Sequence, residues 1–283
     1  MNLRKLVFII AAVLTLLITA CSEKAPAITG KLFIIGGGEK SDSLMNELVD
    51  LAGVRTGGYV FILPMAGENP DSSIIWTGDE FRRTGIKNIS AYNFKRGEIP
   101  SAAEIDSIKN ARLIFISGGD QSRFMDVVLN TPIMDAIITA WKNGAVISGT
   151  SAGASVMSKT MITGNQMKHP GLESSYPTIE TGNMELKEGL GLLKNVIIDQ
   201  HFVKRQRLNR LIAISIENPG KLCTGIDEST AIIVDRETAT VTGSGQVVVI
   251  RNNGIKKMIR KGMLGTEGLN VSVYLPGDKF NLK

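Results

Sequence analysis

The sequence predicts an α/β domain in which helices cover both faces of a mostly parallel sheet. From residue 31 to residue 148, short apolar segments alternate with longer segments that carry apolar residues at helical spacing. Strands that are apolar at every position are typical of a parallel sheet that is buried on both faces. The first strand runs into three consecutive glycines, which suits the turn from strand to helix in such folds. With 283 residues, of which 43% are hydrophobic, the chain can bury a core without disulfides.

Strands and helices are expected to alternate through this part of the chain, with two helices between the fourth and the fifth strand. The expected strands are Lys31–Ile35, Tyr59–Leu63, Asn88–Phe94, Arg112–Ser117 and Ala145–Ser148. The expected helices are Asp42–Val54, Ser72–Thr84, Ala102–Lys109, Ser122–Leu129 and Pro132–Asn143. Residues 163–191 contain glycine, serine and proline and are expected to form a long loop.

After Asp227 the pattern changes to short strands separated by turn residues. These strands are Ala231–Val234, Thr238–Thr242, Gln246–Ile250 and Val271–Leu275. They predict a small antiparallel extension of the same domain. We therefore expect a single domain over residues 30–283, with its core at about 31–235 and the C-terminal β extension at about 236–283.

The first 20 residues have the pattern of an export signal. Two basic residues precede the apolar run Leu6–Ile18, which is shorter than the ~20 residues that span a bilayer but fits a secretory signal peptide. The run ends in small residues before Cys21, which resembles the bacterial lipoprotein signal, in which this cysteine is acylated. We expect residues 1–20 to be removed, Cys21 to anchor the chain to a membrane of the cell envelope, and residues 21–29 to form a tether. The domain would then face the periplasm or the cell surface. The alternative is an ordinary signal peptide cut after Ala20.

Composition argues against several classes of protein. The chain has 32 basic and 27 acidic residues, and apart from one cluster after His201 the basic residues are spread along it, so we expect no nucleic-acid partner. The glycines after the first strand lack the third glycine of a dinucleotide motif, and no phosphate-binding GxxxxGK[ST] motif is present. Because only His169 and His201 could supply imidazoles, we expect no metal and no cofactor. Cys223 is expected to be a buried, unpaired cysteine.

The strand at Ala145–Ser148 leads into the pattern G-x-S-x-G, with Ser151 at its centre. A strand, this pattern and a helix in succession describe a nucleophile elbow. The flanking glycines, Gly149 and Gly153, allow a sharp turn that lifts the Ser151 hydroxyl above the sheet. Free N–H groups at the start of the following helix can stabilise developing negative charge. The alternative is a glycine-rich turn or an anion cradle without catalysis.

A nucleophilic serine needs a base, and the better placed histidine is His201. It follows the apolar run Val196–Gln200, at the carboxyl end of a strand, which is the edge of the sheet where Ser151 is expected. His169 lies in the long loop and is expected at the surface or at a pocket rim. The alternative for His201 is a hydrogen-bonded structural role.

A carboxylate must orient the imidazole, and the first choice is Glu228, after a short strand. Asp199 and Asp227 compete for this role. The order Ser–His–Glu differs from the Ser–Asp–His order of α/β-hydrolases, so the elbow belongs to a different α/β fold.

A basic cluster, Lys204, Arg205, Arg207 and Arg210, follows His201. Such clusters usually form a solvated helix face. Cations at the start of a helix oppose its macrodipole, however, and a negatively charged ligand would offset that cost. Two glutamines at strand ends, Gln121 and Gln200, are further candidates to line a pocket, with capping of the strand ends as the alternative.

Four motifs taken together resemble the cyanophycinase and peptidase E family of serine peptidases. They are Gly118-Gly-Asp-Gln121, Gly149-Thr-Ser-Ala-Gly-Ala154, Asp199-Gln-His-Phe202 and Gly225-Ile-Asp-Glu228. The resemblance covers roughly residues 31–234. It implies a three-layer α/β/α fold like that of class I glutamine amidotransferases, with serine in place of their cysteine. It also implies that Ser151 is the nucleophile, His201 the base and Glu228 the acidic residue.

The resemblance further implies an oxyanion hole. Gly119 and Asp120 match the oxyanion-hole loop of the family, and the N–H of Ala152 would be the second donor. Arg205, Arg207 and Arg210 match arginines that bind aspartyl and main-chain carboxylates in the family.

The resemblance implies that the chain is a serine exopeptidase. Its substrate would be an acidic peptide that is cleaved at an aspartyl or β-aspartyl bond. Cyanophycin, a polymer of aspartate with arginine side branches, and isoaspartyl peptides both fit. Cyanophycin is an intracellular store, whereas this chain carries an export signal, so the choice between them stays open. The alternatives from other classes are a catalytically inactive envelope lipoprotein that binds acidic peptides and an amidotransferase-like transferase. A homodimer is compatible with the sequence.

Overall fold

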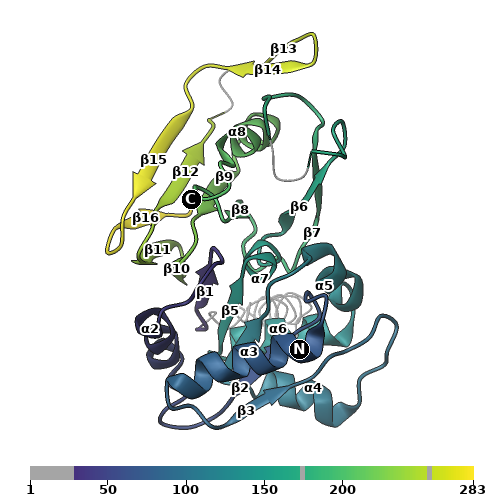
Figure 1. Ribbon diagram of the computed structural model, residues 1–283, viewed down its shortest axis with the longest axis vertical. Helices are drawn as coiled ribbons and strands as arrows, with labels where there is room; N and C mark the ends of the chain where they lie inside the picture. The colour runs from purple at the N-terminus through teal and green to yellow at the C-terminus, as the bar shows by residue number, and fades with distance from the viewer. Residues whose placement is uncertain (1–28, 173–175, 254–256) are drawn as a thin grey trace, which may run out of the picture.

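The computed structural model describes residues 29–172, 176–253 and 257–283. A large sheet with the strand order β16-β11-β10-β1-β5-β4-β2-β3 runs through its centre (Figure 1). Its strands are β1 (Leu32–Ile35), β2 (Val60–Leu63), β3 (Ile89–Ala91), β4 (Leu113–Ile116), β5 (Val146–Thr150), β10 (Thr230–Asp235), β11 (Thr238–Gly243) and β16 (Lys279–Asn281). The five strands from β1 to β3 along this order are parallel, while β10, β11 and β16 are antiparallel. The predicted α/β fold with a mostly parallel sheet is confirmed.

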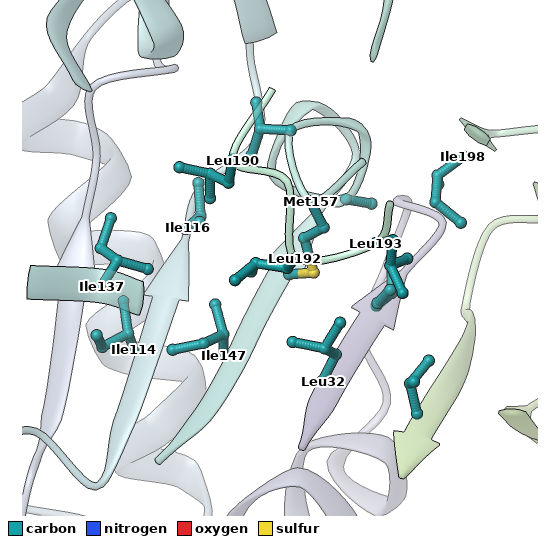
Figure 2. Close-up of a cluster of buried hydrophobic side chains, with 14 of the residues drawn as sticks. Leu32, Ile114, Ile116, Ile137, Ile147, Met157, Leu190, Leu192, Leu193 and Ile198 are labelled. Atoms are coloured by element: carbon teal, nitrogen blue, oxygen red, sulfur yellow. The ribbon is translucent and has the colours of Figure 1, made fainter. Parts of the chain in front are cut away.

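Helices cover both faces of this sheet. As a result, every position of its central strands β1, β2, β4 and β5 is buried. The helices of this part are α2 (Asp42–Ala52), α3 (Pro70–Arg83), α4 (Ala102–Lys109), α5 (Gln121–Val128), α6 (Pro132–Lys142) and α7 (Ala152–Ser155). Alternate residues of β1 point to opposite faces: Phe33 packs in the core beneath α2 and α3, and Leu32 in the core beneath α4, α5 and α6. Figure 2 shows Leu32 in this second core with Ile114, Ile147 and Met157.

A second, smaller sheet has the order β15-β12-β9-β8. It is formed by β8 (Val196–Gln200), β9 (Leu222–Ile226), β12 (Val247–Arg251) and β15 (Asn270–Tyr274), and α8 (Leu208–Glu217) packs against β9 and β12. The strands β8 and β9 are parallel to each other, and β12 and β15 add to them as antiparallel strands. The predicted antiparallel C-terminal strands are therefore present, but they are divided between the two sheets.

The expected long loop at residues 163–191 is in part a β-hairpin, and that expectation is corrected. The strands β6 (Thr160–Gln166) and β7 (Met184–Glu188) pair across it, with an irregularity between Ile162 and Gln166. A second hairpin, β13 (Lys257–Arg260) with β14 (Met263–Thr266), lies farther along the chain. The edge strand at residues 88–94 is also shorter than expected, since only Ile89–Ala91 pairs with β2.

The export signal and Cys21 lie outside the described residues. Within the described ranges, no helix is long and apolar enough to cross a membrane. Cys223 is buried and unpaired, as expected, and burial raises the pKa of its thiol to about 12.

Candidate active site

The candidate site lies where the carboxyl ends of four strands meet. The loops after β1, β4 and β5 come together at one edge of the large sheet, and β8 brings His201 to them from the small sheet. Backbone hydrogen bonds join the pieces: the N–H of Ser151 donates to Ile35 at 3.1 Å, and the N–H of His201 donates to Gly36 at 2.8 Å. This edge is where open α/β sheets bind ligands.

Ser151 has the backbone of a nucleophile elbow. It sits between β5 and α7 with φ 54° and ψ −111°, a sparsely populated conformation for a residue with a side chain. The glycines on either side are required by packing. A β-carbon on Gly149 would overlap the backbone of Gly153, and one on Gly153 would overlap the carbonyl of Ile116. The G-x-S-x-G pattern therefore reflects a turn that is pressed directly against the neighbouring strand end.

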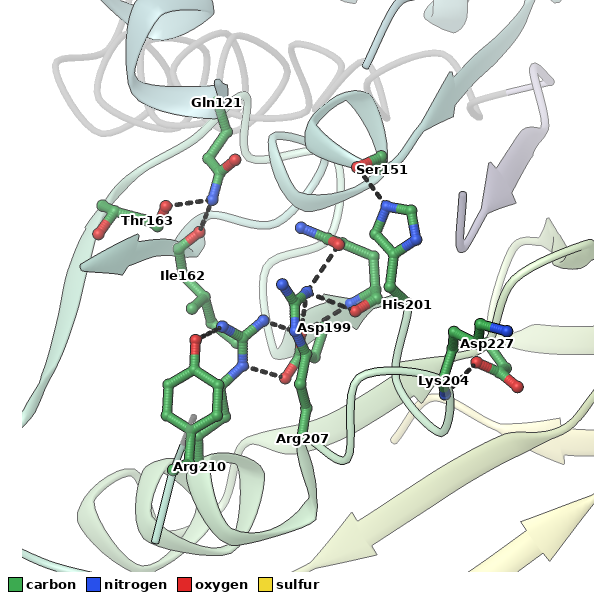
Figure 3. Close-up of polar contacts among 12 residues, drawn as sticks. Gln121, Ser151, Ile162, Thr163, Asp199, His201, Lys204, Arg207, Arg210 and Asp227 are labelled. Carbon is green, nitrogen blue, oxygen red and sulfur yellow. Dashed lines mark hydrogen bonds and ion pairs between the residues drawn. The ribbon is translucent and has the colours of Figure 1, made fainter. Parts of the chain in front are cut away.

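Ser151, His201 and Glu228 form one hydrogen-bonded line. The Nε2 atom of His201 lies 2.8 Å from the Ser151 hydroxyl oxygen, and its Nδ1 atom lies 2.7 Å from a carboxylate oxygen of Glu228. A carboxylate can only accept a hydrogen bond, so Nδ1 carries the proton and Nε2 is free to accept the proton of Ser151. Figure 3 shows the serine and the imidazole facing each other across this contact. This is the arrangement in which a serine is activated by a base and the base is held by an acid.

The environment of His201 favours its neutral form. Burial lowers the pKa of the imidazole, and the positive charges of Arg205 and Arg207 lower it further, while the contact with Glu228 acts in the opposite direction. The net direction is downward. The imidazole is therefore unprotonated, and able to act as a base, at neutral pH.

The other two candidate carboxylates are bound elsewhere. Asp199 is buried, and both of its oxygens accept hydrogen bonds from Arg210. Asp227 accepts a hydrogen bond from the backbone N–H of Lys204 at 2.9 Å. Of the three candidates, Glu228 is the one that contacts the imidazole in this structure.

Gly37 and Gly38 leave room for the side chains of His201 and Glu228. None of the four motifs includes these two glycines. The imidazole of His201 lies directly over Gly37, where a β-carbon would overlap the ring, and a β-carbon on Gly38 would lie 2.7 Å from that of Glu228. Gly37 also has φ 109°, which side chains rarely tolerate. The sequence does contain a signal for both site glycines, namely three consecutive glycines at the carboxyl end of a strand.

The loop that is predicted to supply the oxyanion hole lies beside Ser151. The turn at Gly118 and Gly119 lies against Ser151, since a β-carbon added to Gly118 would lie 3.4 Å from that of Ser151. Among the described residues, the N–H groups of Gly119 and Ala152 donate to no other group. Both are available to an oxyanion.

Asp120, the other residue predicted in this loop, has its hydrogen-bonding groups bound within the protein. Its N–H donates to the carbonyl of Ala66 at 2.8 Å, and its side chain caps α5 by accepting from the N–H groups of Ser122 and Arg123. Asp120 therefore ties the turn at Gly118 and Gly119 to Ala66 and to the start of α5, and its N–H is already bound.

The three arginines expected to bind a carboxylate are not equivalent. Arg210 is buried and binds other groups of the protein: its Nε donates to Asp199 at 2.7 Å, one Nη donates to the Tyr176 hydroxyl at 2.5 Å, and its guanidinium lies 4.8 Å from the centre of the Tyr176 ring. Figure 3 shows Arg210 paired with Asp199 beside Arg207. In this structure Arg210 is paired with the buried Asp199, and its contact with substrate stays a prediction.

Arg207 is intermediate, and Arg205 is exposed. Arg207 is buried and donates to the backbone and side-chain oxygens of Gln200 at 2.5 and 2.7 Å, while its Nε has no partner among the described residues. Burial, with the charge of Arg210 next, lowers its pKa to about 10. Arg205 lies at the surface beside the base.

The two glutamines bind within the protein. The side-chain amide of Gln121 donates to the carbonyl of Ile162 at 2.8 Å and also to that of Thr163, so it holds β6 to the start of α5 (Figure 3). Gln200 accepts from Arg207. His169 pairs with Glu180 at 2.5 Å, and its side chain is 37% exposed.

A pocket of about 330 Å³ opens beside Ser151 and His201. Besides the loops after β1 and β4, it is lined by Lys40 and by one side of α3. No cluster of His, Cys, Asp and Glu suited to a metal occurs in the parts of the chain that the structure describes.

Comparison with known proteins supports the resemblance seen in the motifs. The pattern of peptidase family S51 matches residues 32–242. The chain is 30% identical over 274 residues to a cyanophycinase of Nostoc sp., covering 92% of this chain and 88% of that protein. It is 28% identical over 151 residues to a peptidase E of Actinobacillus pleuropneumoniae, covering 50% and 59% of the two chains.

The fold is similar to that of a crystal structure of a peptidase from an acI-B1 actinobacterium. The TM-score is 0.68 at 22% identity, covering 90% of this chain and 98% of that one. The family match spans the elbow, the strand that carries His201 and the loop that carries Glu228. The chain therefore belongs to peptidase family S51.

Proposed function

We propose that this member of peptidase family S51 is a serine exopeptidase that hydrolyses aspartyl or β-aspartyl bonds through an acyl-enzyme. The observation that carries the proposal is the unbroken line of hydrogen bonds from the Ser151 hydroxyl through His201 to Glu228.

The proposed reaction has two halves. Ser151 attacks the carbonyl carbon of the bond while Nε2 of His201 takes its proton, and the N–H groups of Gly119 and Ala152 bind the resulting oxyanion. Nε2 then gives the proton to the leaving amine, and the C–N bond breaks. In the second half, water gives a proton to the same nitrogen as it attacks the ester. The bond between the acyl carbon and the Ser151 oxygen then breaks, and Nε2 returns the proton to that oxygen. Glu228 holds the imidazole in the required tautomer throughout.

The preference for an acidic acyl group rests on unbalanced charge. Arg205, Arg207 and Arg210 lie close together. Among the described residues, the carboxylate that pairs with Arg207 and Arg210 is Asp199. The lowered pKa of Arg207 and its unpartnered Nε indicate that this guanidinium is incompletely compensated. A carboxylate of the substrate at Arg205 and Arg207 would supply the missing charge. The named relatives, a cyanophycinase and a peptidase E, favour the same class.

The first experiment is labelling with a serine-directed phosphonate, read by intact mass and peptide mapping. One adduct is expected, on Ser151, and the Ser151→Ala variant should lose the adduct and several orders of magnitude of turnover. No adduct, or an adduct on another serine, would overturn the proposal in favour of an inactive protein that binds acidic peptides.

The substrate class is tested by relative kcat/KM on matched peptides. Wild type should cleave β-Asp-Arg polymer or isoaspartyl peptides roughly ten- to a hundredfold better than asparaginyl analogues. The reason is that loss of a hydrogen bond to a charged group costs about 1.5–3 kcal/mol of binding free energy. Equal cleavage of aspartyl and asparaginyl peptides would contradict carboxylate recognition. Transfer of the acyl group to an added amine in preference to water would point to a transferase.

We also propose that the protein is a lipoprotein of the cell envelope, anchored through Cys21. The support is the sequence pattern before that residue. Labelling of cells with a palmitate analogue should mark wild type but not Cys21→Ala. Equal labelling of both would contradict the anchor.

A further inference from the structure

The helix α3 presents one face to the pocket beside Ser151. The lining residues Ser73, Trp76, Thr77 and Glu80 have the spacing i, i+3, i+4 and i+7, which places them along one side of a helix. Within this face the Trp76 side chain is 69% exposed. A large, nearly rigid indole thus stands in the wall of the pocket that also contains the serine and the imidazole.

The same pocket contains a sheltered ion pair. The ammonium of Lys40 lies 2.9 Å from a carboxylate oxygen of Glu80, and both side chains are mostly buried. This single contact uses one hydrogen-bond donor of Lys40 and one acceptor position of Glu80. The remaining donors of the ammonium and acceptor positions of the carboxylate can bind a ligand. The part of the pocket lined by this pair is therefore polar but not strongly charged.

This pocket is separate from the arginine group. None of Arg205, Arg207, Arg210, Gln121 and Gln200 lines it, whereas Ser151 and His201 do. The two parts of a substrate leave the reacting carbon in different directions. If the acyl part lies against the arginines, as the proposed function requires, the leaving part extends into the pocket of α3, next to the imidazole that protonates the leaving amine.

We propose that Trp76 is a specificity-determining residue for the leaving group, binding flat side chains on its indole face. An aromatic ring or a guanidinium can stack there, and the Lys40–Glu80 pair in the same pocket can bind polar atoms at its edge. A branched aliphatic side chain gains less, and a carboxylate side chain is disfavoured by the electron-rich face of the indole. This inference rests on the proposed function, because it assigns the leaving-group side of the same site.

The test compares wild type with Trp76→Ala on a series of β-aspartyl peptides that differ only in the leaving residue, which is Arg, Phe, Leu or Glu. Ile75 supplies the matched control: it is the preceding residue of α3 and 57% exposed, but it does not line the pocket. Trp76→Ala should lower kcat/KM for the Arg and Phe peptides by roughly three- to thirtyfold and for the Leu peptide by less than about twofold. Ile75→Ala should leave all four within about twofold.

Two further measurements separate this role from a structural one. Trp76→Phe should restore most of the selectivity, since it keeps a flat face, and the rate of Ser151 labelling by a small phosphonate should not change in Trp76→Ala. An equal loss on all four peptides, or the same loss in Ile75→Ala, would overturn the role of Trp76 while leaving the proposed function standing. A wild-type protein that cleaves none of the peptides and takes no phosphonate would overturn both.

Discussion

Replacing Glu228 by glutamine tests the line of hydrogen bonds most directly. The change keeps the size of the side chain but turns an acceptor-only carboxylate into an amide. Loss of a charge-assisted hydrogen bond costs about 1.5–3 kcal/mol, or roughly 10- to 150-fold in rate. The Glu228 side chain is 30% exposed, so solvent screens part of its charge and the lower end of that range applies.

The tautomer of His201 adds a larger effect. A glutamine NH₂ group that donates to Nδ1 forces the imidazole proton onto Nε2, where it faces the Ser151 hydroxyl and the base is lost. In a serine protease of another fold, the same carboxylate-to-amide change lowers kcat by about 10⁴. We therefore expect Glu228→Gln to lower kcat/KM by between a hundredfold and ten-thousandfold, with the fold intact. Glu228→Ala should be no less active than Glu228→Gln, because alanine lets the imidazole choose its tautomer.

The assay is kcat/KM on one β-aspartyl peptide, with thermal melting as the check on folding. Asp227→Asn is the matched control, because its carboxylate accepts from the backbone of Lys204 and does not touch the imidazole. It should stay within a fewfold of wild type. Full activity in Glu228→Gln together with an inactive Asp227→Asn would refute the assignment and pass the role to Asp227.

Two further predictions follow from packing around the site. Gly37→Ala should displace the imidazole of His201 and abolish most of the activity. The control is Gly97→Ala, at another glycine of positive φ but with open space around it, and this variant should keep its activity. Retained activity in Gly37→Ala would contradict the close contact between Gly37 and the imidazole. Asp199→Asn should destabilise the fold by about 3–5 kcal/mol in urea unfolding, because it leaves the buried Arg210 uncompensated. Adding Arg210→Leu should recover part of that loss, and a change below about 1 kcal/mol in the single variant would contradict the buried pair.

The large sheet is predictable from the sequence because its signals are local. A run of apolar residues that ends in glycine marks a buried parallel strand and its carboxyl end at once, and such ends meet at one edge of a sheet. That logic places Gly119 and Ser151 together from the sequence alone. It cannot show that Val196–Gln200 belongs to a second sheet, since buried apolar strands of two neighbouring sheets have the same pattern.

The division of labour among the arginines is beyond sequence reasoning. Arg205, Arg207 and Arg210 carry the same charge within six positions, and spacing alone cannot say which is buried. Their difference is set by Asp199, on the strand before them, and by Tyr176, from the distant hairpin. Tertiary contacts of this kind decide whether a cation is a structural partner or a ligand-binding group.

The exposed arginine also leads to a prediction about pH. The base must be neutral, so kcat/KM should rise with pH through the pKa of His201 in the free enzyme and then level off. Burial places that pKa below the usual value of 6.5, and the charge of Arg205 lowers it further. The acidic limb of the profile should therefore lie below pH 6.5.

Removing that charge should move the limb in a known direction. In Arg205→Gln the protonated imidazole is less disfavoured, so its pKa rises and the acidic limb shifts to higher pH. The reduced kcat/KM expected from lost carboxylate binding changes the height of the profile but not its midpoint. Lys204→Gln is the matched control, because the neighbouring side chain is exposed and its backbone, not its ammonium, contacts Asp227. A limb that stays in place in Arg205→Gln, or moves equally in Lys204→Gln, would show that burial alone sets the pKa of the base.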